Sequence, residues 1–440
     1  MINFTRNLFG IDEKVAIFLS SKIFSYSAYP ITLFFLIKYL TLEQQGYFYT
    51  FYMLLALSMF LELGLGIVLT NIASHEFAKL KWSKNNFLIG NENSLNRVKS
   101  LIKKTILWYL CIASIFFILM IPVGIILFSD ISIDLFKSWM LLVFVFAPGL
   151  VFSPILSILQ GFQKITEVQF IIFLQTLSSI IMFWLGLFFG YGIDALAIQF
   201  LVQNTISFIF IFFRYRNLIK SSFLFSGKFF SWRKEVLPLQ VKTGLAWAIG
   251  YLGLNLMVPF VMKIFGPEIA GQLGMSIRIA EVISVVGLAW TNTRVPQMGK
   301  LIAERNFLSF KNLFYQSLKS IALIGFILLL ALLSMLYFLE LYNYSLILDR
   351  ILNIRLILLL MLGYYSFSIS NYLSMSIRAF KVEKMIIPNL ISLVCYGTAM
   401  YFAMIYDNYS IIVATFLAIN VTILLPSAIF FIKRELNYYV

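Results

Sequence analysis

The sequence has 440 residues, of which 61% are hydrophobic and 12% are charged, with 34 Lys and Arg against 19 Asp and Glu. About 25% of the residues of an average soluble domain are charged, so this composition excludes a soluble protein and predicts an all-α integral membrane protein. Both cysteines fall in apolar segments. The single histidine, His75, is expected at a membrane edge, where it is either a solvated cytoplasmic residue or a catalytic one. We expect no disulfide, metal site or cofactor.

Twelve apolar segments are long enough to span a membrane. The first, Val15 to Ile37, is too long for the apolar part of a signal peptide and lacks a cleavage site, so we expect it to be retained. Its Lys22 either extends to the nearby membrane edge or lines a cavity. The second span, Gly46 to Ser74, carries Glu62 near its middle, either as a functional carboxylate or protonated and bonded to a neighbouring helix.

The fourth span should be bent, because Pro148 and Pro154 lack the N–H groups that a helix uses. The basic segments 79–104 and 214–242 are predicted to be cytoplasmic, the first as a loop and the second as a linker with an amphipathic surface piece. The remaining spans are expected at residues 106–128, 139–159, 168–189, 193–213, 243–262, 269–293, 313–338, 356–377, 385–405 and 411–432. The last four of these have few polar residues, so they indicate little about function.

The eighth span, Ile269 to Thr293, is the most informative because it carries Arg278 and Glu281. A charge at the centre of a membrane helix costs roughly 2.5 to 3.5 kcal/mol, so neither side chain is expected to face lipid. At a spacing of i, i+3 the two residues share a helix face and can pair. Ser284 continues this polar face, which therefore predicts that the helix lines either a helix interface or a water-filled cavity.

Lys and Arg are concentrated in alternate connecting segments. The positive-inside rule then predicts that both termini lie in the cytoplasm of a multi-pass protein. The excess of positive charge is explained by this orientation and by anionic membrane lipids, and it requires no nucleic acid partner.

The sequence also contains an internal repeat. LTLEQQG at 40–46 matches FGPEIAG at 265–271, and QGFQKITE at 160–167 matches RAFKVEKM at 378–385, with offsets of 225 and 218 residues. A nearly constant offset predicts two six-helix bundles, residues 1–213 and 243–440, joined by a cytoplasmic linker, 214–242. The bundles would be related by a pseudo-two-fold axis along the membrane normal, with a central cavity between them.

Three segments resemble the Wzx-type polysaccharide flippases, the O-antigen and capsule branch of the multidrug/oligosaccharidyl-lipid/polysaccharide exporter superfamily. They are LTLEQQGYFYTFYMLLALSMFLELGLG, QGFQK and FGPEIAGQLGMSIRIAEVISVVGLAW. Arg278, Glu281 and Pro296 are also similar to the eighth span of the lipid II flippases. The first span departs from that pattern, because those proteins carry arginines deeper in the membrane and this chain has only Lys22 nearby.

The resemblance implies that undecaprenyl-diphosphate-linked oligosaccharide, a precursor of lipopolysaccharide O-antigen or capsule, moves to the outer leaflet of the bacterial inner membrane by alternating access. Arg278 and Lys22 would offset the charge of the diphosphate. Glu281 or Glu62 would couple transport to a gradient of H⁺ or Na⁺. A polysaccharide polymerase and a chain-length regulator are the expected protein partners, and no catalytic residue is expected.

Hydrogen bonds to the sugar hydroxyls would come from Tyr251, Asn255 and Gln203. Two alternatives stay open. A multidrug exporter of the same superfamily would carry small cations and would favour an acidic cavity. A membrane polysaccharide polymerase or ligase would be expected to have a large outer loop, whereas the outer segments predicted here are short.

Overall fold

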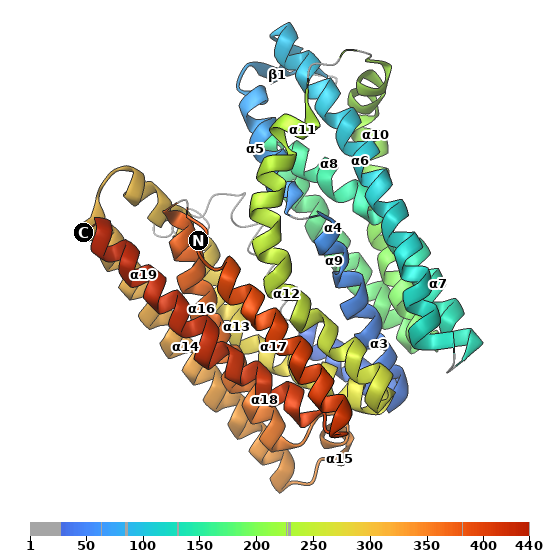
Figure 1. Cartoon of the computed structure of the whole chain (residues 1–440). Coiled ribbons are helices and arrows are strands. Elements are labelled where there is room, and N and C mark those ends of the chain that lie inside the picture. Colours follow the sequence, from blue (N-terminus) through green and yellow to red (C-terminus); the bar gives the residue numbers. More distant parts are fainter. Residues whose placement is uncertain are drawn as a thin grey trace, which may run out of the picture. The chain divides into compact units, whose positions relative to one another are not determined.

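The computed structural model describes residues 28–439, except 63, 84–86, 130–131, 226, 228–229 and 381 (Figure 1). Almost all of the described chain is helical, and the strands in it form one small antiparallel hairpin of β1, Leu80–Trp82, and β2, Leu88–Gly90. The chain divides by its internal contacts into two units, and α3, Leu42–Ala56, and α12, Leu237–Phe265, contribute residues to both.

The first unit holds the described residues up to Thr41 and Leu55–Leu245. Besides the hairpin and the start of α12, it contains the helix Ala28–Tyr39, α4 Ser58–Glu62, α5 Leu65–Phe77, α6 Glu92–Gly124, η1 Ile125–Ser129, α7 Ile133–Phe146, α8 Gly149–Gly161, α9 Ile165–Phe188, η2 Gly192–Asp194, α10 Ala195–Leu224 and α11 Trp232–Glu235.

The second unit holds Leu42–Leu54, which is most of α3, and the chain from Ala246 onward. After α12 it contains α13 Pro267–Ala303, α14 Phe307–Leu341, α15 Ser345–Leu348, α16 Ile354–Ala379, α17 Ile386–Ile405, α18 Ser410–Ile419, η3 Asn420–Leu424 and α19 Leu425–Tyr439. The most extensive helix pairing in this unit is between α13 and α16.

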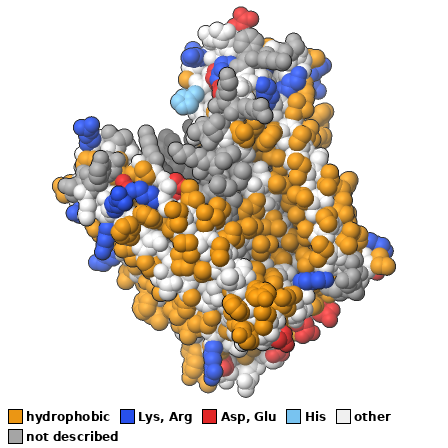
Figure 2. All heavy atoms as spheres, in the orientation of Figure 1, with side chains coloured by type: hydrophobic (Ala, Val, Ile, Leu, Met, Phe, Trp, Pro, Cys, Tyr) orange, Lys and Arg blue, Asp and Glu red, His pale blue; other side chains and the backbone are white. Residues whose placement is uncertain are grey.

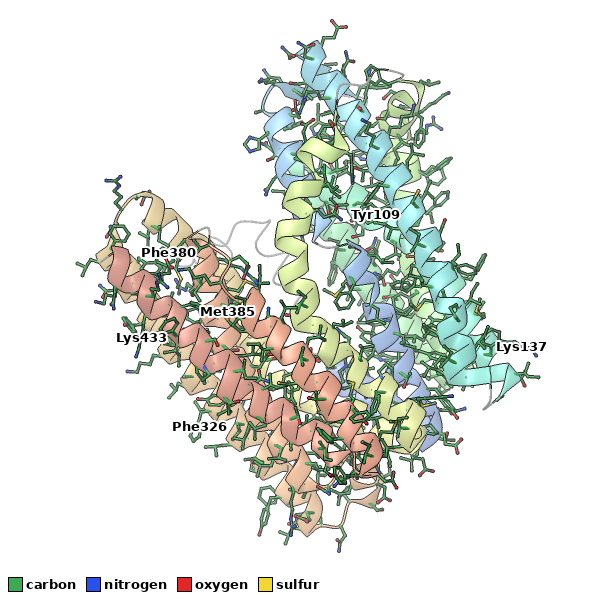
Figure 3. The ribbon with its side chains drawn as sticks, viewed as in Figure 1. Tyr109, Lys137, Phe326, Phe380, Met385 and Lys433 are labelled. Atoms are coloured by element: carbon green, nitrogen blue, oxygen red, sulfur yellow. The ribbon has the colours of Figure 1, made fainter. Side chains whose placement is uncertain are left out.

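Eight helical segments of the described chain are long and apolar enough to cross a membrane. Large apolar side chains cover their outer flanks, for example Phe326 on α14 and Phe213 on α10, which are 49% and 71% exposed (Figures 2 and 3). Soluble proteins rarely expose apolar surface on this scale. These apolar flanks are therefore suited to contact with membrane lipid.

The second predicted span is broken in the structure. Helix α4 ends at Glu62, and α5 begins after Gly64, which has φ of 68°. Glycine takes this left-handed conformation readily because it has no Cβ. The prediction of one continuous helix from Gly46 to Ser74 is therefore wrong, and Glu62 lies at a helix end.

The prediction of a loop over residues 79–104 is also wrong, because the β-hairpin occupies its start and α6 begins at Glu92. The side chain of Asn91 accepts a hydrogen bond from the backbone N–H of Ser94, which caps the helix. Val98 and Leu101, three residues apart, are buried on one side of α6. The low average hydrophobicity of this segment concealed the apolar face that makes it helical.

The predicted bend in the fourth span is present as a break between α7 and α8 at Ala147 and Pro148. The break leaves the backbone carbonyl of Val145 without its helical partner. The side-chain amide of Asn204, on α10, donates to this carbonyl at 2.7 Å. A side chain from a neighbouring helix therefore satisfies a backbone group that has no access to water in a bilayer.

A charged cluster ties the end of the first unit to α6. Arg97 donates to Glu76 of α5 at 2.7 Å and also to Glu235 of α11. Lys103 donates to the carbonyl of Phe225 at 3.2 Å, and Lys104 donates to that of Phe230. The predicted linker is thus largely structured, because α10 continues to Leu224 and α12 begins at Leu237.

Replacing Arg97 by Ala should lower the free energy of unfolding by about 1 kcal/mol, since two charge-assisted hydrogen bonds are lost at a partly exposed site. The melting temperature of the protein in detergent would report this loss. Lys137→Ala is the matched control, because the ion pair of Lys137 with Asp134 is 70% and 89% exposed and should contribute almost nothing (Figure 3). Equal melting temperatures for Arg97→Ala and the parent protein would contradict the assigned role.

Candidate functional site

The site is built on α13, which packs closely against α3 within the second unit. A Cβ added to Gly46 would lie 1.9 Å from the carbonyl oxygen of Pro267, and one added to Gly271 would lie 2.9 Å from the backbone nitrogen of Gly46. A Cβ on Gly274 would lie 2.4 Å from the ring of Tyr49. The glycines therefore let the two helices touch backbone to backbone at their starts.

Arg278 lies one turn beyond this contact. Its Nη1 donates to Oε2 of Glu281 at 2.8 Å, so the pair predicted from the i, i+3 spacing is present. The guanidinium carbon is 4.7 Å from the centre of the Tyr52 ring on α3, a cation–π geometry. The side chain of Arg278 is 13% exposed and that of Glu281 is 35% exposed. The cation is thus paired and oriented, while the carboxylate stays partly accessible.

Two tyrosines extend this polar cluster. The hydroxyl of Tyr251 on α12 interacts electrostatically with Glu281 and with Arg378, and that of Tyr364 on α16 interacts with both Arg278 and Glu281. Asn255 lies one turn along α12, where its amide donates to the backbone carbonyl of Tyr251 at 2.9 Å. Four of the predicted site residues, namely Arg278, Glu281, Tyr251 and Asn255, therefore belong to one unit and are close in its structure.

Sequence reasoning missed Tyr364 because the tenth predicted span was treated as featureless. The segment GYYSFSISNY at 363–372 is nevertheless dense in Tyr, Ser and Asn for a membrane helix. Ser366, Ser368 and Ser370 are buried in the structure. Polar residues within an apolar span are the signal that could have identified this helix as part of the site.

The other predicted residues lie elsewhere. Glu62 is in the first unit, where its backbone carbonyl accepts a hydrogen bond from Gln240 and its carboxylate interacts electrostatically with Tyr109. Gln203 is on α10 of the same unit, and its carbonyl accepts from Ser207 at 3.1 Å. Lys22 lies outside the described residues, as does the side chain of Pro296. It stays a prediction that the side chains of Glu62, Gln203 and Lys22 face the same cavity as Arg278.

No protein-family model matches the chain, and no curated protein matches it either. Solved structures do match. An inward-facing multidrug resistance MATE family transporter of the MOP superfamily aligns over 92% of this chain and 93% of its own, with 13% identity and a TM-score of 0.60. An outward-facing MATE family transporter aligns over 97% of both chains, with 14% identity and a TM-score of 0.58. The chain has a MATE-like transporter fold.

A third solved structure that matches this chain is a MOP superfamily transporter from Pyrococcus furiosus. It aligns over 97% of both chains, with 15% identity and a TM-score of 0.57. That protein is described as having a binding pocket of reverse polarity that suggests a different function. The matches confirm the prediction of a multi-pass membrane protein with about twelve helices in two bundles. At identities this low, the structural matches establish the MATE-like fold alone. The substrate has to be inferred from the residues of the site.

Proposed function

We propose that this protein is a flippase that moves an undecaprenyl-diphosphate-linked oligosaccharide from the cytoplasmic to the outer leaflet of the bacterial inner membrane by alternating access. The observation that carries the proposal is the guanidinium of Arg278, which Glu281 and Tyr52 orient on α13, the predicted eighth span, in a chain with a MATE-like transporter fold. A cation is costly at this depth, so its presence favours an anionic ligand. The resemblance to Wzx-type flippases supplies the identity of that ligand.

The chemistry of such a substrate suits this arrangement. A diphosphate and a glycan cannot cross hydrocarbon unaided, because their polar groups would lose their hydration, whereas the polyprenyl tail can remain in the bilayer. Arg278 would bind the diphosphate with its planar set of donors, helped by Lys22. Tyr251, which interacts electrostatically with Glu281, and Asn255, one turn along α12, would donate to the sugars next to the diphosphate, and Gln203 would contribute from the first bundle.

The ion pair also offers a means of coupling. The carboxylate of Glu281 lies 2.8 Å from the guanidinium that would bind the phosphate, so it is one candidate for the group that couples transport to a gradient of H⁺ or Na⁺. Glu62 is the second candidate. A polysaccharide polymerase and a chain-length regulator would receive the product.

Export of small cationic compounds is the second candidate function. It is favoured by the matched structures, which include multidrug resistance transporters, and by the exposure of Glu281, which exceeds that of Arg278. Repulsion of a cationic substrate by Arg278 argues against it. A polymerase or ligase has no support from the matched structures, which are transporters.

Deleting the gene tests the proposal. Lipid-linked repeat units should accumulate in the inner leaflet, and surface polysaccharide should be lost, because the flipping step would be missing. Restoring the gene on a plasmid should reverse both effects. Unchanged surface polysaccharide together with increased sensitivity to cationic drugs would instead favour the multidrug exporter.

A further inference from the structure

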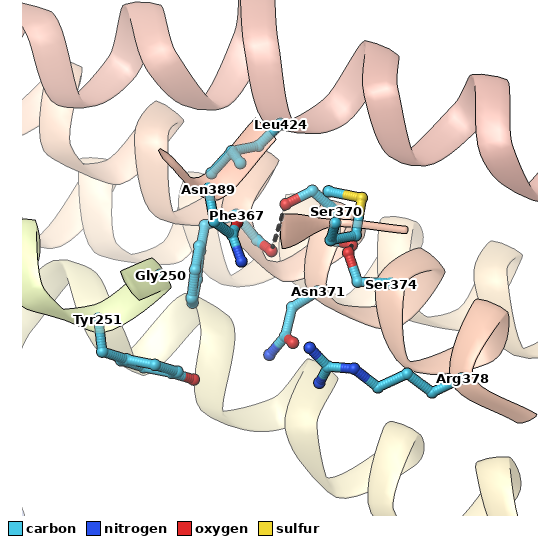
Figure 4. Close-up of a pocket in the computed structure, with 10 residues that line it drawn as sticks. Gly250, Tyr251, Phe367, Ser370, Asn371, Ser374, Arg378, Asn389 and Leu424 are labelled. Carbon is cyan, nitrogen blue, oxygen red and sulfur yellow. Dashed lines mark hydrogen bonds between the residues drawn. The ribbon is translucent and has the colours of Figure 1, made fainter. Parts of the chain in front are cut away.

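A cavity with polar side chains in its lining lies wholly within the second unit, apart from the Arg278 pair. It has a volume of about 60 Å³ and is lined by residues of α12, α16, α17 and η3 and by Met385 (Figure 4). Five of its lining residues follow one face of α16, and the others come from the neighbouring segments. The polar side chains that line it are Tyr251, Ser370, Asn371, Ser374, Arg378 and Asn389.

Arg378, the next-to-last residue of α16, is the one charged side chain among the residues lining this cavity. Its Nε donates to Oε2 of Glu383 at 2.6 Å, and Nη1 is 3.4 Å from the sulfur of Met375, a weak acceptor. Because the guanidinium is planar, these contacts fix its direction. Its terminal nitrogens point into the cavity and toward the amide of Asn371 (Figure 4).

The donors around the cavity suit an oxyanion. These donors are the guanidinium of Arg378, the side-chain amides of Asn371 and Asn389, and the hydroxyl of Tyr251 (Figure 4). The amide of Asn389 is held against the backbone of Gly250, where an added Cβ would lie 3.1 Å from its nitrogen. One water molecule needs about 10–15 Å³ of such space. The cavity therefore admits a few waters or one phosphoryl group.

The position of the cavity relates it to the Arg278 pair. Tyr251 lines the cavity and interacts electrostatically with Arg378 and also with Glu281, the partner of Arg278. The distribution of Lys and Arg predicts that the end of α16 is at the cytoplasmic face. The phosphates of a lipid-linked glycan in the inner leaflet lie at the same cytoplasmic face of the membrane.

We propose that Arg378, Asn371, Asn389 and Tyr251 form a phosphate-binding subsite, which receives one phosphoryl group of the lipid diphosphate at the cytoplasmic leaflet before the diphosphate reaches Arg278. This inference rests on the proposed function for the identity of the lipid. Arg378 binds the ligand directly, whereas Glu383, which is not among the lining residues, orients the guanidinium through Nε.

Pyrophosphate binding to the purified full-length protein tests the subsite, with calorimetry as the readout. The measurement is made in the Arg278→Gln background, so that the first arginine does not contribute. This variant should bind pyrophosphate, and adding Arg378→Gln should weaken binding at least tenfold. Adding Glu383→Gln should leave the affinity equal or higher, because the guanidinium loses a competing anion. Adding Arg434→Gln, at an exposed arginine of α19, should have no effect.

The glutamate variant separates binding from structure. If Arg378 and Glu383 form only a structural ion pair, both substitutions should lower the melting temperature without a tenfold difference in pyrophosphate affinity between them. That result would overturn the subsite, and so would absence of pyrophosphate binding in the Arg278→Gln protein. Displacement of pyrophosphate by undecaprenyl diphosphate, and not by phosphatidylglycerol, would support a substrate site. Equal displacement by both lipids would indicate a general head-group site and would overturn the role in substrate entry.

The two proposals fail separately. Loss of pyrophosphate affinity on Arg378→Gln, with normal surface polysaccharide after gene deletion, would retain the subsite and reject the flippase. Normal pyrophosphate affinity in the Arg378→Gln protein, with accumulated lipid-linked repeat units after deletion, would retain the flippase and reject the subsite.

Discussion

Arg278→Ala is expected to abolish surface polysaccharide while the protein still inserts into the membrane. Hydrogen bonds to a charged group contribute about 1.5–3 kcal/mol each, and 1.4 kcal/mol is a factor of ten, so the rate of lipid translocation should fall at least about tenfold. The substitution removes the guanidinium that Glu281 and Tyr52 orient. The rate can be measured with the purified protein in liposomes that contain the lipid-linked oligosaccharide.

Two further variants show whether the loss reflects binding or folding. Arg278→Ala alone leaves Glu281 without its cation, which is destabilising within a membrane span. The double variant Arg278→Ala with Glu281→Ala removes both charges, so it should recover stability and still fail to transport. Arg278→Lys keeps the charge but lacks the planar donors, so we expect intermediate transport. Full transport by the double variant would show that Arg278 serves only to neutralise Glu281.

The Arg278 pair could be predicted from sequence because its signal is local. Two opposite charges three residues apart in an apolar span define a helix face and a partner by helix geometry alone. The break in the fourth span was likewise encoded by Pro148, whose effect on a helix does not depend on its neighbours. The side chain that donates to the freed carbonyl was not predictable, because Asn204 is 59 residues away in the sequence from Val145.

Other features depended on tertiary contacts. The break at Gly64 follows from a backbone conformation that the run of Glu62 to Gly66 permits but does not require. Tyr364 and Arg378 belong to the site because α16 packs on α13 and α12 brings Tyr251 beside both, and no spacing within α16 reveals this. Arg378 follows directly after the predicted span 356–377, so the sequence places it outside the membrane, although its side chain points into the cavity (Figure 4).

Gly46→Ala is expected to be the most destabilising single-methyl change in the helix contact that supports the site. The added Cβ would lie 1.9 Å from the carbonyl oxygen of Pro267 and 2.7 Å from its carbonyl carbon, and both are backbone atoms. A side chain could rotate away, but here α3 or α13 has to move as a whole. Overpacking in a core typically costs about 1–3 kcal/mol and occasionally more, so we expect about 3 kcal/mol or more, with little folded protein recovered in detergent.

Gly397→Ala is the matched control, because a Cβ there has nothing within 4 Å and Gly397 lies inside α17. Ala is favoured over Gly in a helix by about 1 kcal/mol, so this variant should melt at the same temperature as the parent protein or higher. A Gly46→Ala protein that melts with the parent would show that α3 and α13 are not in backbone contact. Because α3 also carries Tyr52, any Gly46→Ala protein that does fold should hold Arg278 less firmly and transport more slowly.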